Sequence, residues 1–169
     1  MLGKRVALVE RGAEWDAEGT RRGAGYGGTC VHVGCVPKKL MFTASSFLEA
    51  AAEGVGYGVE HGGAARLNWG ALVERRNAYV ERLNSIYIRN LEGASIERVV
   101  GVARFVGPRE VEICDGEGRG RRLCGERVLI AVGGAPTKPE VPGAELAITS
   151  DGFFDLKTQP RKALVVGSG

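Results

Sequence analysis

Three kinds of hydrophobic pattern follow one another along this chain. Near its start, Val6–Val9 form a short apolar run that ends in an acid, which is typical of a buried strand over Lys4–Glu10. The middle of the chain carries apolar residues at helical spacing. From Ser95 onward, short apolar runs are separated by polar and glycine-rich turns and predict strands. Strands on both sides of helices indicate an α/β fold, with the polar, glycine-rich stretch Arg11–Gly28 as a loop.

The first helical segment begins at Thr29, whose hydroxyl is suited to capping a helix, and ends near Gly54. Pro37 lies inside this segment. Because proline removes a backbone hydrogen bond, we expect the helix to be kinked there. A loop is predicted from Gly54 to Gly63, where glycines are frequent.

The second helical segment runs from about Trp69 to Leu91. Asn68 is its candidate N-terminal cap, and Gly93 is its candidate stop. Residues that recur at helical spacing, with charged residues between them, are Leu72, Tyr79, Leu83, Ile86 and Asn90.

The strands predicted beyond Ser95 share short apolar runs bounded by turn residues; they are Ile96–Val100, Val102–Val106, Glu110–Cys114, Arg121–Cys124 and Arg127–Val132. Prolines and glycines then predict a long loop over Gly133–Gly143. A last buried strand is expected over Ala163–Val166, leading directly into Gly167-Ser168-Gly169.

Length and charge exclude several classes of function. The chain has 169 residues, enough for one domain with a core, and a formal net charge of +3. Its basic residues are mixed with acids, so no nucleic-acid-binding patch is indicated, and Arg119, Arg121 and Arg122 are expected in a solvated turn. No stretch is apolar and long enough to span a membrane, and the first residues show no signal peptide.

Two of the four cysteines lie five positions apart, Cys30 and Cys35. In a regular helix such residues have Cα atoms roughly 8–9 Å apart, whereas a disulfide needs about 7 Å or less. The pair is therefore either unbonded or bonded across a distorted turn, which Gly34 permits because it has no Cβ. A strained, accessible disulfide is suited to redox chemistry. Cys114 and Cys124 flank a predicted hairpin and are expected to be reduced.

The run around these cysteines, Gly27-Gly28-Thr29-Cys30-Val31-His32-Val33-Gly34-Cys35-Val36-Pro37-Lys38-Lys39, resembles the active-site signature of the flavin-dependent disulfide reductases. It departs from that signature only at His32, where the family usually has Asn. The resemblance continues through Arg82–Tyr87, Val128–Gly134 and Ile148–Phe154. It is strongest to the branch that reduces glutathione disulfide with NADPH. Branches acting on thioredoxin, trypanothione or mercuric ion are the alternatives, and a non-catalytic truncated product is another.

The resemblance implies a role for each residue of the signature. Cys35 would be the thiolate nearer the flavin, and Cys30 would be the thiol that attacks glutathione disulfide. A helix N-terminus and nearby cations would help by lowering the thiol pKa. Lys38 would lie beside the flavin, while Gly28, Thr29 and Cys30 would contact FAD.

Contacts outside the signature follow from the same resemblance. Ala103 and Gly133 would meet FAD through the backbone, and Tyr87, with Ile86 and Asn90, would contact the substrate. A metal site at His32 is not expected, because structural zinc takes four ligands and the only other histidine, His61, lies in a distant loop. His32 is expected to tune the thiolate mildly or to have no effect. The complete enzyme would be a homodimer.

A dinucleotide-binding fold begins with a strand, a Gly-x-Gly-x-x-Gly turn and a helix, followed by a second strand that ends in an acid. Lys4–Glu10 matches that second strand, so Glu10 is predicted to bind a ribose hydroxyl. We therefore expect an incomplete FAD-binding Rossmann-like domain over residues 1–160, without its first strand and glycine turn. It would contain a parallel sheet with helices and a small antiparallel β-meander. Residues 161–169 would be the first strand of a truncated NADPH-binding domain. A cytoplasmic location is expected, or an organelle if a transit peptide precedes Met1.

Overall fold

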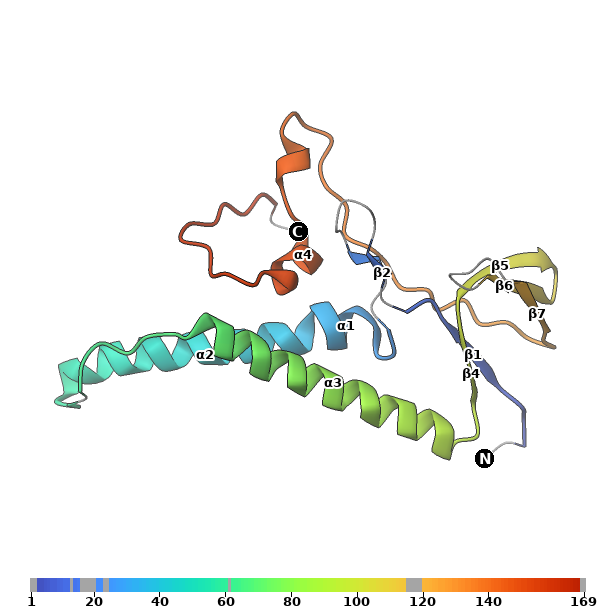
Figure 1. Cartoon of the computed structure of the whole chain (residues 1–169), viewed down its shortest axis with the longest axis horizontal. Helices are drawn as coiled ribbons and strands as arrows, with labels where there is room; N and C mark the ends of the chain where they lie inside the picture. Colours follow the sequence, from blue (N-terminus) through green and yellow to red (C-terminus); the bar gives the residue numbers. More distant parts are fainter. Residues whose placement is uncertain are drawn as a thin grey trace.

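The computed structural model describes residues 3–12, 14–15, 21–22, 25–60, 62–114 and 120–167, and of 14–15 and 21–22 it describes the backbone only. Two long helices occupy one side of the molecule, and the strands lie toward the other (Figure 1). The buried side chains lie mainly where the helices meet, with smaller contributions from two strands. They are Val31, Val33, Pro37, Val73, Arg76, Val80, Val99, Ile113 and Phe154.

The predicted N-terminal strand forms over its second half, as β1 (Ala7–Glu10). It pairs in parallel with β4 (Glu97–Val100), with Val9 opposite Val99. The intervening helices make the crossover that a parallel pair requires. Within the stretch predicted as a loop, β2 (Glu14–Trp15) and β3 (Arg21–Arg22) form a two-residue antiparallel ladder.

The first helical segment is two helices, α1 (Gly28–Val33) and α2 (Cys35–Gly54), separated at Gly34. Two expectations are wrong here. Thr29 is inside α1, where Gly27 precedes the first helical residue, so Thr29 does not cap the helix. Pro37 does not cause the break either, because it lies in the first turn of α2, where a backbone N–H has no partner within the helix.

Helix α2 ends at Gly54 as predicted and passes into a 3₁₀ turn, Val55–Tyr57, inside the expected loop. Helix α3 (Trp69–Gly93) returns alongside α2 in the opposite direction (Figure 1). The cap at Asn68 is confirmed, since its Oδ1 accepts a hydrogen bond from the Ala71 N–H at 3.0 Å. Helix α3 includes Gly93, so the predicted stop is one residue early.

The buried face of α3 differs from the predicted one. Its buried residues are Val73, Arg76 and Val80, whereas Tyr79 is 41% exposed and Asn90 is also exposed. The residues predicted from helical spacing therefore lie beside the buried face of α3 rather than on it. No helix of the described residues is apolar over enough turns to cross a membrane.

The β-meander forms as predicted, from β5 (Val102–Gly107), β6 (Glu110–Cys114) and β7 (Gly120–Cys124). Cys114 lies opposite Gly120, and Cys124 lies opposite Glu110, so the two cysteines are at opposite ends of the β6–β7 ladder. Both are free thiols. Arg119 lies outside the described residues.

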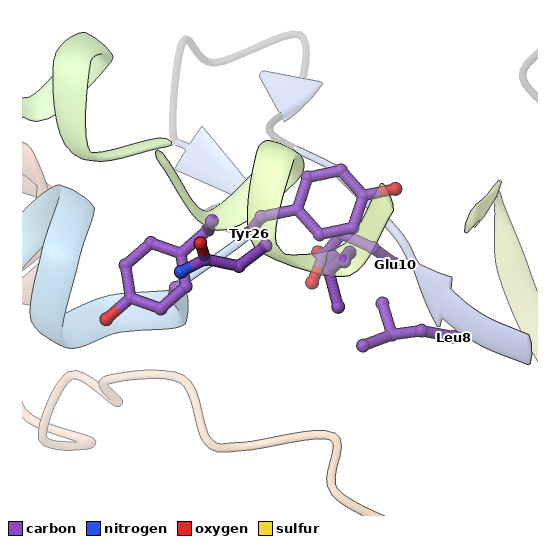
Figure 2. A pocket seen from close by; sticks show the side chains of 7 residues that line it. Leu8, Glu10 and Tyr26 are labelled. Atoms are coloured by element: carbon purple, nitrogen blue, oxygen red, sulfur yellow. The ribbon is translucent and has the colours of Figure 1, made fainter. Parts of the chain in front are cut away.

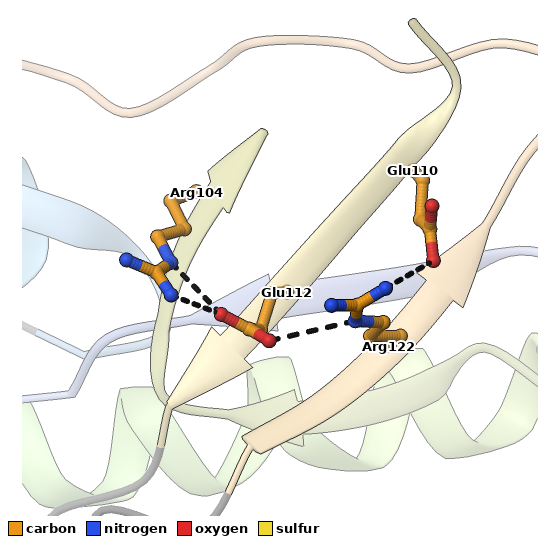
Figure 3. Close-up of polar contacts among 4 residues, drawn as sticks. All are labelled: Arg104, Glu110, Glu112 and Arg122. Carbon is orange, nitrogen blue, oxygen red and sulfur yellow. Dashed lines mark hydrogen bonds and ion pairs between the residues drawn. The ribbon is translucent and has the colours of Figure 1, made fainter. Parts of the chain in front are cut away.

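One face of the meander carries a row of alternating charges (Figure 3). Arg104 on β5 pairs with Glu112 on β6, whose other carboxylate oxygen lies 3.5 Å from Nε of Arg122 on β7. Arg122 also lies 3.5 Å from a carboxylate oxygen of Glu110. Opposite charges on adjacent strands support the pairing of the strands.

Two predicted strands do not form. The segments predicted as strands, 127–132 and 163–166, have no helix or strand, and Leu129, Val132 and Leu164 are 89%, 89% and 90% exposed. A strand needs a hydrogen-bonded neighbour, and none lies beside either segment among the described residues. Ser168 and Gly169 lie outside those residues.

The predicted loop Gly133–Gly143 is confirmed. After it come a 3₁₀ turn, Ala144–Leu146, and the short helix α4 (Ser150–Asp155). Helix α4 lies close to α1 (Figure 1).

Candidate functional site

The cysteine pair lies on either side of the break between α1 and α2. Cys30 is the third residue of α1, Cys35 is the first residue of α2, and both thiols are free and exposed. A Cβ placed on Gly34 would lie 2.8 Å from the carbonyl oxygen of Thr29 and 3.2 Å from Cα of Cys30. Both neighbours are backbone atoms that cannot rotate away. The break between the two cysteines therefore requires glycine.

The thiol of Cys30 does not have the lowered pKa that was expected from a helix N-terminus and nearby cations. A hydrogen bond with the Cys35 side chain raises the pKa of Cys30, because it stabilises the protonated thiol. The positive charge of Lys38 acts in the opposite direction but is a smaller influence. In the dithiol form, the partner cysteine thus dominates over the neighbouring lysine.

His32 connects helix α1 to the turn before it. Its Nε2 donates a hydrogen bond to the carbonyl oxygen of Tyr26 at 2.9 Å, so this nitrogen carries a proton. The Arg98 guanidinium lies over the Tyr26 ring, 5.6 Å from its centroid. Among the described residues, no group of three or more His, Cys, Asp and Glu side chains is arranged to hold a metal ion. His61 lies outside the described residues.

A cavity of about 390 Å³ lies directly beside the cysteine helices. Two predicted cofactor residues, Thr29 and Lys38, line it together with Val33 and Gly34. The opposite wall comes from α4, through Ser150, Phe153 and Phe154. The two phenylalanine rings meet edge to face, with centroids 5.3 Å apart. Sequence reasoning did not assign these three residues to the site, although the aromatic pair after Ser-Asp-Gly was a visible signal.

A second cavity, of about 220 Å³, lies at the carboxyl end of β1 (Figure 2). Glu10 lines it, and one of its carboxylate oxygens accepts a hydrogen bond from the Gly12 N–H at 3.0 Å. Figure 2 shows the Tyr26 ring beside the Glu10 side chain. Tyr87 and Asn90 of α3 also line this cavity, so a predicted cofactor residue and two predicted substrate residues lie around one space.

The remaining predicted residues lie outside the linings of these two cavities. Ala103 is exposed on β5, and Ile86 is half-buried on α3. Gly28 and Gly133 have φ angles of +62° and +69°, and no atom lies within 4 Å of the position that a Cβ would occupy at either. Both glycines therefore leave their backbones accessible to a ligand, in a conformation that other residues rarely adopt.

Comparison with known proteins finds a matching family and several relatives. The family model for pyridine nucleotide-disulphide oxidoreductases matches residues 2–169. A glutathione reductase from Yarrowia lipolytica is 40% identical over 97% of this chain and 37% of its own length. One from Schizosaccharomyces pombe is 37% identical over 99% of this chain and 34% of its own length. One from Nostoc sp. is 45% identical over 85% of this chain and 30% of its own length. The chain thus spans about a third of the length of these curated relatives.

Proposed function

The chain belongs to the pyridine nucleotide-disulphide oxidoreductase family, and on this premise we propose that it forms the dithiol and FAD-binding part of an NADPH-dependent glutathione-disulfide reductase. The observation that carries the proposal is that Cys30 and Cys35 lie on either side of Gly34, beside the cavity of about 390 Å³ lined by Lys38, which we call the Lys38 cavity. The α/β fold, with its parallel β1–β4 pair, is the Rossmann-like fold of this family. Residues 1–160 would form the FAD-binding domain, and 161–169 would begin an NADPH-binding domain.

The residues around the Lys38 cavity fit one part of FAD. Phe153 and Phe154 provide an aromatic wall for a flat ring, and Lys38 provides a cation for its electron-rich edge. Gly28 leaves the backbone open next to Thr29. The flavin, when bound, would supply the electron pair from NADPH that keeps the dithiol reduced. Glu10 would bind a ribose hydroxyl of FAD, and Ala103 and Gly133 would meet FAD through the backbone.

The dithiol itself would carry out the reaction with the substrate. The Cys30 thiolate would attack one sulfur of glutathione disulfide, forming a mixed disulfide and releasing one glutathione thiolate. The Cys35 thiolate would then attack Cys30 Sγ, releasing the second glutathione and leaving a Cys30–Cys35 disulfide. Tyr87, Ile86 and Asn90 on α3 would contact glutathione. In the complete enzyme, two subunits would assemble as a homodimer.

The test uses the reduced chain with Cys114 and Cys124 replaced by Ser, so that only the proposed pair can react. On addition of glutathione disulfide, the intact mass should fall by about 2 Da as the pair is oxidised. Cys35→Ser should instead accumulate a stable glutathione adduct of about 305 Da on Cys30, because no second thiol resolves it.

Cys30→Ser is the matched control, and it should form an adduct more slowly if Cys30 is the attacking thiol. Equal adduct formation in both single variants would contradict the assignment of roles. Failure of the Cys30–Cys35 pair to oxidise would contradict the proposed function. Parallel assays with oxidised thioredoxin in place of glutathione disulfide would show whether the chain instead belongs to the branch that acts on thioredoxin.

A further inference from the structure

Arg76 is a buried charge at the junction of three helices. It is 4% exposed, and burying a guanidinium is costly unless its N–H groups are hydrogen-bonded. Its Nη2 donates to the carbonyl oxygen of Phe154 at 2.7 Å and to Oδ1 of Asn77 at 2.8 Å. Its Nη1 lies 3.5 Å from Sδ of Met41 on α2. One side chain of α3 thus contacts both α2 and α4.

The contacts from α3 converge on the C-terminal end of α4. The Arg76 guanidinium lies over the Phe154 ring, 5.9 Å from its centroid. About two helical turns before Arg76, at the start of α3, Nε1 of Trp69 donates to the carbonyl oxygen of Leu156 at 3.2 Å. Carbonyl groups at the end of a helix have no partner within the helix, so Arg76 and Trp69 supply partners there.

Helix α4 depends on these contacts because of its length. It has six residues, and a helix this short is not stable alone in water. Its position is therefore set by what it packs against. The same helix supplies Ser150, Phe153 and Phe154 to the wall of the Lys38 cavity. Whatever holds α4 also shapes the cavity.

We propose that Arg76 is a positioning residue that holds α4 against α3 and thereby fixes the aromatic wall of the Lys38 cavity. The cavity then takes a planar aromatic ring between α4 and the cysteine helices. The identification of that ring with the flavin of FAD rests on the proposed function. Arg76 is not itself one of the residues that line the cavity, and it contacts the lining at Phe154, so its influence on binding passes through α4.

The experiment follows α4 through tryptophan fluorescence. The chain has two tryptophans, so Trp15→Phe leaves Trp69 as the single reporter, hydrogen-bonded to the residue that follows α4. In this background Arg76→Met removes the charged donor at similar length, and Arg76→Lys keeps one donor for the Phe154 carbonyl. Arg75→Met is the matched control, since Arg75 is the preceding residue and is exposed.

We expect Arg76→Met to shift Trp69 emission to longer wavelength and to raise its quenching by acrylamide. The dissociation constant for FAD, from flavin fluorescence, should rise by about tenfold or more, as expected for loss of a hydrogen bond from a charged group. Arg76→Lys should restore part of both signals, and Arg75→Met should change neither. If Arg76→Met matches Arg75→Met in Trp69 emission, the inference is overturned.

A second variant, at Phe153, tests the role of the aromatic wall separately from the role of Arg76. Phe153 is 38% exposed, so Phe153→Leu should leave the fold and Trp69 emission unchanged while weakening FAD binding. Unchanged FAD binding in Phe153→Leu would refute the role of α4 as a wall. If the parent chain does not bind FAD, the proposed function fails, and Trp69 emission alone still decides whether Arg76 holds α4. Circular dichroism checks that α2 and α3 remain helical in each variant.

Discussion

Replacement of Gly34 by Ala tests whether the break between α1 and α2 is required by the packing of backbone atoms. The added Cβ would lie 2.8 Å from the Thr29 carbonyl oxygen and 3.2 Å from both Cα of Cys30 and the Thr29 carbonyl carbon. Relief requires the backbone of α1 to move, because none of these atoms belongs to a flexible side chain. Overpacking of this kind costs about 1–3 kcal/mol. Gly34 lies between the helices, so Ala gains little from its helix propensity to offset that cost.

The free energy of unfolding should therefore fall by about 1–3 kcal/mol in Gly34→Ala, measured by urea denaturation followed by circular dichroism. Movement of α1 also displaces Cys30 from Cys35, so oxidation of the pair by glutathione disulfide should be slower. Gly93→Ala is the matched control, since Gly93 is within α3 and no atom lies within 4 Å of its Cβ position. It should be neutral or stabilising, by up to about 1 kcal/mol. A Gly34→Ala chain as stable as the parent, with unchanged oxidation, would refute the reasoning.

Three further predictions follow from single contacts. Cys35→Ala should lower the pKa of Cys30, because it removes the hydrogen bond that raises it, whereas Lys38→Met should raise that pKa further. The pH dependence of iodoacetamide alkylation measures the pKa in both variants. An unchanged Cys30 pKa in Cys35→Ala would contradict the role of the hydrogen bond with Cys35. Asn68→Ala should cost about 0.5–2 kcal/mol of unfolding free energy by removing the cap of α3, with the exposed Ser85→Ala as a control expected near zero. The pKa of Glu112 is held below its ordinary value of 4.5, mainly by the hydrogen bond from Arg104, so the stabilisation from this pair is present above pH 4.5 and is lost as the pH falls through the lowered pKa. Arg104→Gln should raise that pKa and flatten the acid loss of stability, and identical urea midpoints against pH in both chains would disprove the assignment.

The elements that the sequence predicted well are those whose signals are local. Strand β6 has the predicted bounds because its apolar residues alternate with polar ones and turn residues flank the run. Helix α3 begins where predicted because the Asn68 side chain accepts a hydrogen bond from the backbone N–H three residues later. The segments 127–132 and 163–166 have equally strong apolar patterns but form no strand. A strand depends on a neighbouring chain segment, and a local pattern carries no information on whether that neighbour is present.

The residues of the candidate site also divide into those with a local sequence signal, which were predicted, and those without one, which were missed. The cysteine pair, Lys38 and Thr29 were identified because the signature is contiguous in the sequence. The wall formed by α4 was missed, since Arg76 and Phe154 are 78 positions apart and nothing near either one indicates the contact. The lowered pKa expected for Cys30 was wrong for a geometric reason, because the hydrogen bond with Cys35 depends on how the two helices meet at Gly34.

The separation between the cysteines and α4 also has a consequence for synthesis of the chain. More than a hundred residues lie between Cys35 and Leu156, the residue that follows α4 and accepts the hydrogen bond from Trp69. At 5–20 residues per second, a ribosome takes on the order of ten seconds to complete that stretch. During this interval the helices carrying the thiols can form while the aromatic wall beside them does not yet exist. We therefore expect the cysteine pair to be most open to oxidants in the nascent chain, before the cavity beside it is complete.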